Sequence, residues 1–336
     1  MNGKYLYPFF AVCILALIAW IGSDVFGLQL LFGVILPYAA VVVFFVGFVM
    51  RMLNWARSTV PFRIPTTAGQ AKTLDWLPQN KIDSPFTTAG VVARMFLEVV
   101  TFRSLFRNTK LKVNPDGRIA YDLEVFLWVA ALAFHYTFLV VLLRHARFFL
   151  DPLPLPFEIL ETIDNFVQIG QPTISLSSFV LLAAVLYLFI RRLYIANVRY
   201  ISLANDYFPL FLIIGIVLSG IIMRYFIKVD VATAKEITYG LTTFQLPALA
   251  KMKEVGAIFY IHMFFVSVLL AYFPWSKLMH LGGIFLSPSR NLANNSRAVR
   301  HVNPWNYPVK VHTYDEYEDD FREKMIEAEL PVEKKE

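Results

Sequence analysis

Six long apolar runs constrain this chain more than any other feature, because each approaches or exceeds the ~18 to 20 residues that a helix needs to cross a bilayer. Of the 336 residues, 57% are hydrophobic and 17% are charged, whereas soluble domains average about 25% charged residues. Inside lipid the backbone polar groups must pair with one another, which favours helices. We therefore predict an all-α fold, a polytopic membrane bundle of about six transmembrane helices. The runs are Tyr5–Gly22, Phe26–Met50, Val125–Leu143, Pro172–Ile190, Tyr207–Met223 and Val255–Trp275. A very short turn is expected at Asp24, between the first two.

Basic residues concentrate in alternate loops, which sets the predicted orientation. Residues 51–118, 191–199 and 277–300 are rich in lysine and arginine, and the positive-inside rule assigns such loops to the cytoplasm. The protein is then expected to span the cell membrane with both termini in the cytoplasm. The predicted domains are two N-terminal transmembrane helices (1–54), a cytoplasmic loop with an interfacial helix (55–121), a four-helix core (122–280) and a cytoplasmic tail (281–336).

Two of the loops carry amphipathic segments. After a potential capping pair, Thr87 and Thr88, apolar side chains gather on one helical face while charged ones flank or oppose it. This pattern predicts an interfacial helix, although a helix packed on a partner protein fits equally well. Residues 157–169 show a second apolar stripe and predict a helix lying on the outer membrane surface. The apolar face of the first segment comprises Val92, Met95, Phe96, Val99 and Phe102, and the charged residues are Arg94, Glu98 and Arg103.

Cysteine usage and motifs exclude several classes of protein. The single cysteine, Cys13, excludes a disulfide framework, and it excludes an iron–sulfur cluster held by this chain alone. The sequence has no CxxC pair, no glycine-rich phosphate loop and no nucleophile elbow. The net charge of +6 accompanies the membrane spans, so it indicates topology and no nucleic-acid binding.

Four of the six histidines lie on or beside two spans, and this is the strongest functional signal. His135 and His145 belong to the third span, and His262 and His280 to the sixth. Because these spans run in opposite directions, the pairs His135–His280 and His145–His262 are predicted at an inner and an outer depth. The other two histidines, His301 and His312, lie in the polar tail and are expected to be solvated.

Two histidine pairs on facing helices are what a dihaem cytochrome b needs, since each iron takes one imidazole from each helix. The spacings differ, however: ten residues span ~15 Å of helix and eighteen span ~27 Å. Pro274 lies between His262 and His280 and is expected to kink or end that helix. The alternative is that these histidines only form hydrogen bonds with neighbouring helices.

The two spacings resemble those of the cytochrome b gamma subunit of respiratory nitrate reductase. That resemblance implies that spans two to six here match the family, that His145 and His262 hold an outer b-type haem, and that His135 and His280 hold an inner one. All four residues would then be iron ligands.

A narrower resemblance lies in the first cytoplasmic loop, in PFRIPTTAGQ (61–70) and DSPFTTAGVVARMFLEVVTFRSLFRNTK (83–110). Both segments resemble the DsrM family, the cytochrome b subunit of the DsrMKJOP complex of sulfur metabolism. The resemblance implies menaquinol as electron donor and a cytoplasmic iron–sulfur partner subunit resembling heterodisulfide reductase. It also implies further membrane and extracytoplasmic subunits, and a role in dissimilatory sulfur metabolism such as sulfate reduction.

Charged residues on the outer side complete the candidate site. Guanidinium groups bind carboxylates bidentately, so Arg144, Arg147 and Arg224 are candidates to bind haem propionates; the alternative is that they are membrane-edge arginines. Glu158 and Asp164 lie on the side where quinol oxidation would release protons and are candidate proton acceptors.

The predicted function is that of a quinol-oxidising electron-transfer subunit of an oxidoreductase complex. Electrons from menaquinol would pass through the two haems to the cytoplasmic iron–sulfur partner. The alternatives are a gamma subunit of a nitrate or heterodisulfide reductase, and a non-redox membrane transporter or anchor, which would show no haem absorbance.

Overall fold

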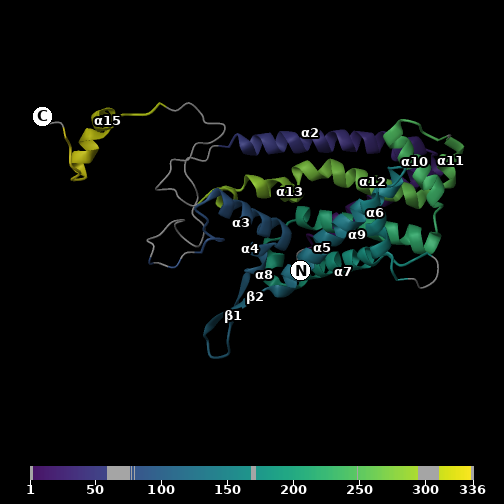
Figure 1. The fold of residues 1–336 in the computed structure, drawn as a ribbon, viewed down its shortest axis with the longest axis horizontal. Helices are drawn as coiled ribbons and strands as arrows, with labels where there is room; N and C mark the ends of the chain where they lie inside the picture. Colours follow the sequence, from purple (N-terminus) through teal and green to yellow (C-terminus); the bar gives the residue numbers. More distant parts are fainter. Residues whose placement is uncertain are drawn as a thin grey trace.

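The computed structural model describes residues 3–58, 76, 78, 80–167, 172–247, 249–293 and 310–333. It confirms the all-α prediction, with six helices long and apolar enough to cross a membrane (Figure 1). The segment 61–70 and His301 lie outside the described residues. The spans are Leu6–Val25, Leu31–Ala56, Val125–Phe148, Leu176–Tyr194, Ala204–Ile227 and Ala257–Trp275.

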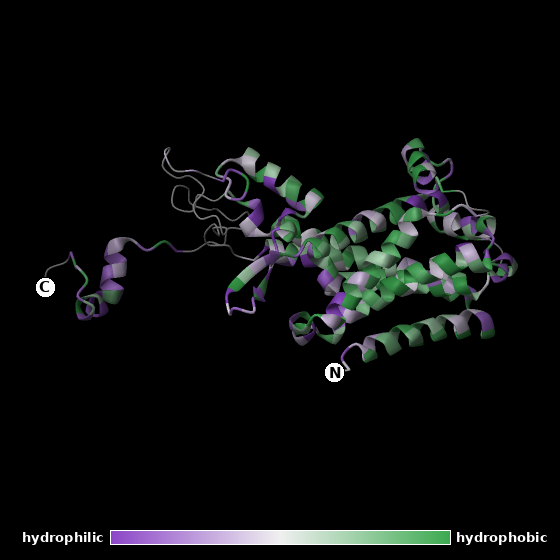
Figure 2. Ribbon diagram, turned by 90° about the horizontal axis from the view of Figure 1, so that it is seen from below, coloured by the Kyte–Doolittle hydropathy of each residue, from purple (hydrophilic) through white to green (hydrophobic). Residues whose placement is uncertain are grey.

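The spans form an antiparallel bundle, and Figure 2 shows that its helices are predominantly apolar. One end, called here the α3 end, carries α3, the β1–β2 hairpin and α13; the other, the α10 end, carries α10 and α11, with α6 close by (Figure 1). The long helices are α1 (Leu6–Trp20), α2 (Leu36–Ala56), α5 (Val125–Arg144), α7 (Leu176–Tyr194), α9 (Ala204–Ile221) and α12 (Ala257–Tyr272). The shorter ones are α3 (Thr88–Thr101), α4 (Arg103–Phe106), α6 (Leu155–Asp164), α8 (Ala196–Ile201), α10 (Val231–Thr243), α11 (Leu249–Glu254), α13 (His280–Gly283), α14 (Pro288–Asn291) and α15 (Tyr314–Glu327).

The first turn lies later in the chain than expected. We predicted it at Asp24, but the helix continues through a π-helical segment, Ile21–Val25, and the chain turns at residues 26–28. Gly27 takes φ +68° there, a conformation that a side chain disfavours. Local backbone freedom thus places this turn, and the charge at position 24 does not.

The histidine-bearing helices are held by different neighbours. Helix α12 packs against α1, α2 and α9, and α5 packs chiefly against α7, whereas α5 and α12 show no extensive backbone packing on each other over the described residues. Only 6% of the most apolar stretch of α5 is buried, compared with 33% for α12. Over its apolar stretch, α5 therefore has fewer protein neighbours than α12.

The sixth span is broken where proline predicts it. Helix α12 ends at Tyr272, a 3-10 turn covers Phe273–Trp275, and Ser276 is extended with ψ 173° before helix resumes. A Cβ at Gly47 of α2 would lie 2.7 Å from the Cβ of Pro274, so the missing side chain lets α2 approach the break. His262 and His280 are therefore not joined by one straight helix, which removes the geometric conflict with the ten-residue spacing on α5.

Helix α3 forms as predicted, but its charged face does not point to solvent. The side chain of Thr87 caps it by accepting a hydrogen bond from the amide of Gly90 at 3.1 Å. The apolar Val92 and Phe96 are exposed, whereas Arg94 and Glu98, expected to flank or oppose the apolar face, are buried against the protein. An exposed apolar face fits either a membrane surface or a partner protein, as the sequence left open.

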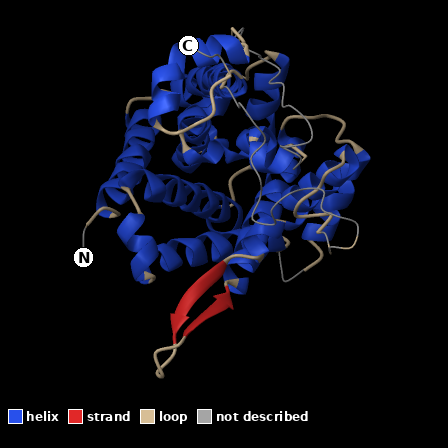
Figure 3. Ribbon diagram, turned by 90° about the vertical axis from the view of Figure 1, so that its left-hand side faces the viewer, coloured by secondary structure: helices blue, strands red, loops and turns tan. Residues whose placement is uncertain are grey.

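A hairpin, and two helices in the loop between spans five and six, were not expected from the sequence. A hairpin, β1 (Thr109–Val113) and β2 (Ile119–Leu123), projects from the side of the bundle in Figure 3. Helices α10 and α11 occupy the loop between spans five and six. Thr238 of α10 donates a hydrogen bond to the carbonyl of Phe148 at 2.7 Å, so α10 covers the short turn, His145–Phe148, that follows α5. In the tail, α15 begins with a capping box between Thr313 and Glu316.

Candidate functional site

The structure brings the four membrane histidines together in two pairs, those expected from the antiparallel topology. The ring centroids of His135 and His280 lie 5.9 Å apart, with ring planes at 82°. Those of His145 and His262 lie 6.3 Å apart, with planes at 10°. His135 lies within α5 and His280 begins α13, while His145 follows the last residue of α5 and His262 lies in the first half of α12. Each pair thus joins one residue of span three to one of the sixth span or its continuation.

Every one of these rings is oriented through its Nδ1 atom. His135 and His145 bond the carbonyls of Ala131 and Val141 at 2.7 and 2.6 Å, and His280 bonds the carbonyl of Lys277 at 2.8 Å. A carbonyl only accepts, so in these rings Nδ1 donates and Nε2 keeps its lone pair. A metal-ligating histidine is typically held in this way.

His262 is oriented by a side chain that no sequence motif marks, the hydroxyl of Ser219. Its Nδ1 lies 2.9 Å from the hydroxyl of Ser219 on α9, and that hydroxyl in turn lies 2.9 Å from the carbonyl of Ile216. Because the only hydroxyl proton goes to that carbonyl, the oxygen accepts from Nδ1. None of the four Nε2 atoms has a hydrogen bond within the described residues. No sequence pattern pairs Ser219 with a residue 43 positions later, so only the fold identifies it.

The pairs fit the geometry of a metal held between two imidazoles. Two bonds of about 2 Å to a first-row metal, plus the distance from each nitrogen to its ring centre, separate the ring centres by about 6.2 Å. The observed values are 5.9 and 6.3 Å. Rotation about the metal–nitrogen bond is free, so parallel and perpendicular planes are both compatible. With the sparse packing between α5 and α12, the residues present fit two haems with paired imidazole ligands.

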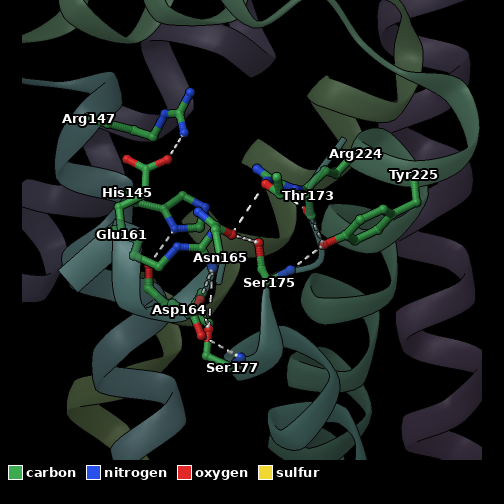
Figure 4. A network of polar contacts seen from close by, with 12 residues as sticks. His145, Arg147, Glu161, Asp164, Asn165, Thr173, Ser175, Ser177, Arg224 and Tyr225 are labelled. Carbon is green, nitrogen blue, oxygen red and sulfur yellow. Dashed lines mark hydrogen bonds and ion pairs between the residues drawn. The ribbon is translucent and has the colours of Figure 1, made fainter. Parts of the chain in front are cut away.

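A buried polar network adjoins the His145–His262 pair at the α10 end (Figure 4). Arg144 and Asp164 form an ion pair at 2.6 Å, with side chains 9% and 8% exposed. Arg144 also donates to Ser175 at 2.7 Å, and the Asp164 carboxylate accepts from both the amide and the hydroxyl of Ser177 at 2.7 Å. The network joins the end of α5 to α6 and to the start of α7, and so fixes the position of His145.

The other two candidate arginines are also engaged within the protein. Arg147 forms an ion pair with Glu161. Arg224 donates to the carbonyl of Thr173 at 3.1 Å and to its hydroxyl at 3.2 Å. The Nε atoms of Arg144 and Arg224 are buried and have no acceptor in the described part of the chain, so the Nε–H of each remains available to a bound group.

The two candidate proton acceptors lie on different faces of α6. Asp164 is buried in the network described above, whereas Glu158 is exposed and lines an open depression of about 290 Å³. The remaining lining residues are Leu155, Ile159, Thr162 and Ile163. Only Glu158 is therefore accessible to a molecule that arrives from outside the protein.

Comparison with known proteins identifies the family. Residues 100–301, more than half of the chain, match the model of the nitrate reductase gamma subunit. The chain is 43% identical over 279 residues to the Hdr-like menaquinol oxidoreductase cytochrome b-like subunit of Archaeoglobus fulgidus, an alignment that covers 82% of this chain and 83% of that protein. It is 38% identical over 274 residues to the protein of the same name from Archaeoglobus profundus, covering 80% and 81%. With its six apolar helices, this is a multi-pass membrane protein, and it belongs to the nitrate reductase gamma subunit family.

Proposed function

We propose that this chain is the cytochrome b subunit of a membrane oxidoreductase complex that oxidises menaquinol. The observation that carries the proposal is the presence of two pairs of neighbouring imidazole rings. In each ring Nδ1 is hydrogen-bonded and Nε2 keeps its lone pair. The names of the two archaeal relatives support the assignment to a menaquinol oxidoreductase. His135 and His280 would hold one b-type haem, and His145 and His262 the other; when bound, these haems supply one-electron transfer between the two sides of the membrane.

In this proposal the α10 end faces outward and receives menaquinol. The exposed apolar residues of α6, Leu155, Ile159 and Ile163, suit contact with a lipid-soluble substrate, and Glu158 lies among them to accept a proton. Asp164 is assigned a positioning role, because its carboxylate already accepts hydrogen bonds from Arg144 and Ser177. Arg144 and Arg224 would each direct the remaining Nε–H toward a haem propionate, while Arg147 is held by Glu161.

The α3 end then faces the cytoplasm and the electron acceptor. We propose an iron–sulfur subunit resembling heterodisulfide reductase as that acceptor, in a complex of dissimilatory sulfur metabolism with further membrane and extracytoplasmic subunits. A single cysteine is too few for a cluster in this chain, and the exposed apolar residues of α3 offer contact area.

A spectrum of the purified protein tests the proposal directly. The dithionite-reduced form is expected to show b-type haem bands, and extraction of the haem as its pyridine complex is expected to give two haems per chain. Reduction of these bands by a menaquinol analogue tests the donor. A purified, folded protein without haem absorbance would support a transporter or anchor and would refute the proposal.

Substitution of Glu158 tests the proton acceptor. Glu158→Gln removes the basic carboxylate but keeps the size of the side chain, so we expect menaquinol-driven haem reduction to slow by about 10²-fold or more with haem content unchanged. Glu236→Gln, on α10 at the same end, removes the same charge outside the α6 depression and should leave the rate unchanged. Equal rates for both variants and the unsubstituted protein would exclude Glu158 as the acceptor.

A further inference from the structure

Buried nitrogen atoms without a hydrogen-bond acceptor gather on arginines at both ends of the bundle. In the described residues, the buried side-chain donors that lack a partner all belong to four arginines. A buried donor is rarely left unpaired, so each such group indicates a missing partner. Arg144 and Arg224 adjoin the His145–His262 pair, as described above. The other two, Arg94 and Arg290, lie at the α3 end and have no role in the function proposed so far.

Arg94 and Arg290 come from two elements that pack on each other. Arg94 lies on α3 and is 8% exposed, and both its Nε and Nη1 atoms are buried without an acceptor. Arg290 lies on α14, which packs against α3; its Nη1 donates to the hydroxyl of Ser287 at 3.3 Å, while its Nε is buried and unpaired. Two neighbouring cations thus retain three unused donors between them.

The nearby carboxylates offset the charge of these arginines only in part. Asp83 forms ion pairs with Arg103 and Arg107. Glu98 accepts hydrogen bonds from the amide of Ser104 at 3.1 Å and from its hydroxyl at 2.6 Å. Burial, together with repulsion from Arg290 and Arg103, lowers the pKa of Arg94, although Glu98 and Asp83 act in the opposite direction. The cluster therefore holds more positive charge than its own acids compensate.

Both elements lead directly from the His135–His280 pair. Phe102, the residue that follows α3, packs edge-on against the ring of His135 with centroids 4.9 Å apart. Arg94 lies eight residues earlier on α3, ~12 Å along its axis. On the other side, His280 begins α13, and α14 follows it after one short turn. The two arginines therefore lie on the two chain segments that lead away from this histidine pair, where these segments pack on each other.

We propose that Arg94 and Arg290 form an oxyanion site between α3 and α14, occupied by a propionate carboxylate of the haem held by His135 and His280. This rests on the proposed function. Guanidinium groups present paired N–H donors that match a carboxylate, and the unused nitrogens here are donors of that kind. The site repeats at the α3 end the role given to Arg144 and Arg224 at the α10 end.

Redox titration of the purified holoprotein tests this site without measuring turnover. Loss of a positive charge beside a haem favours its oxidised form, so in Arg94→Gln and Arg290→Gln we expect the potential of one haem to fall by about 59 mV, a tenfold change for one electron. The second haem should be unaffected. Arg94→Lys keeps the charge and should shift less. Arg118→Gln, at an exposed site in the hairpin loop, is the control and should change neither potential.

The possible results distinguish failure of the oxyanion site from failure of the proposed function. If the unsubstituted protein contains no haem, the proposed function fails. If it contains two haems and neither glutamine variant shifts a potential or loses haem, the oxyanion site is overturned while the function stands. A free anion is the other source of the same chemistry: inorganic phosphate would then raise the melting temperature of the unsubstituted protein but not of Arg94→Gln, with both potentials unchanged, and this result would refute the propionate. Loss of one haem from Arg94→Gln, with its retention in Arg94→Lys, supports it.

Discussion

Replacing His135 or His280 with alanine is expected to remove the same haem, because each iron would depend on one nitrogen from each partner of the pair. Replacing His145 or His262 should remove the other haem. The ring distances of 5.9 and 6.3 Å motivate this grouping. Haem content per chain and redox titration of each purified variant measure the result. Each variant should lose about half of its haem, and the two variants of one histidine pair should retain a haem of the same potential.

His312 provides the matched control for these variants. It lies just before α15 with its side chain 51% exposed, so His312→Ala should retain two haems with unchanged potentials. If His135→Ala and His280→Ala lost different haems, or if both variants kept two, the pairing proposed here would be wrong.

Replacing Asp164 with alanine is expected to be the most destabilising single change at the α10 end. It leaves the guanidinium of Arg144 buried without its counter-ion and removes the acceptor for the Ser177 amide. Removing one partner of a buried ion pair costs about 3–5 kcal/mol. The midpoint of denaturant-induced unfolding in detergent measures this loss. Because the network fixes the end of α5 at His145, the haem held by His145 and His262 should also be released first.

Two comparisons isolate the role of the buried charge. Glu158→Ala, on the exposed face of the same helix, should change the free energy of unfolding by only about 0.5 kcal/mol. The double variant Arg144→Met/Asp164→Leu buries no unpaired charge and should be more stable than Asp164→Ala alone. If the double variant were as unstable as the single one, lost hydrogen bonds and packing would explain the effect instead of the charge.

Much of the fold could be predicted from the sequence because hydropathy and helical periodicity are local properties. The six spans, the cap at Thr87, and the break at Pro274 all follow from residue types within a few positions of one another. The first turn lies later than predicted, because Gly27 provides the backbone conformation that the turn needs and the single charge of Asp24 does not end the helix.

In the candidate site, too, some features could be predicted from the sequence and others could not. Residue spacing and span direction were enough to predict His135 with His280 and His145 with His262. They could not reveal that Ser219 orients His262, that Asp164 pairs with Arg144, or that Arg94 is buried while Phe96 is exposed. The residue type determines the chemistry of a histidine or arginine side chain, but the helix that packs beside it determines its hydrogen-bond or ion-pair partner.

The sequence by itself therefore determined the membrane class, the number of apolar spans and the residue types of the candidate site, since each depends on composition and local order. Only the tertiary structure decided which donors are satisfied and which remain available. The imidazole rings of His145 and His262 lie close together, although the backbones of α5 and α12 do not pack extensively on each other over the described residues. That arrangement arises from the packing of α7, α9 and α2 around them, and packing between distant segments leaves no signal in the spacing of residues along the chain.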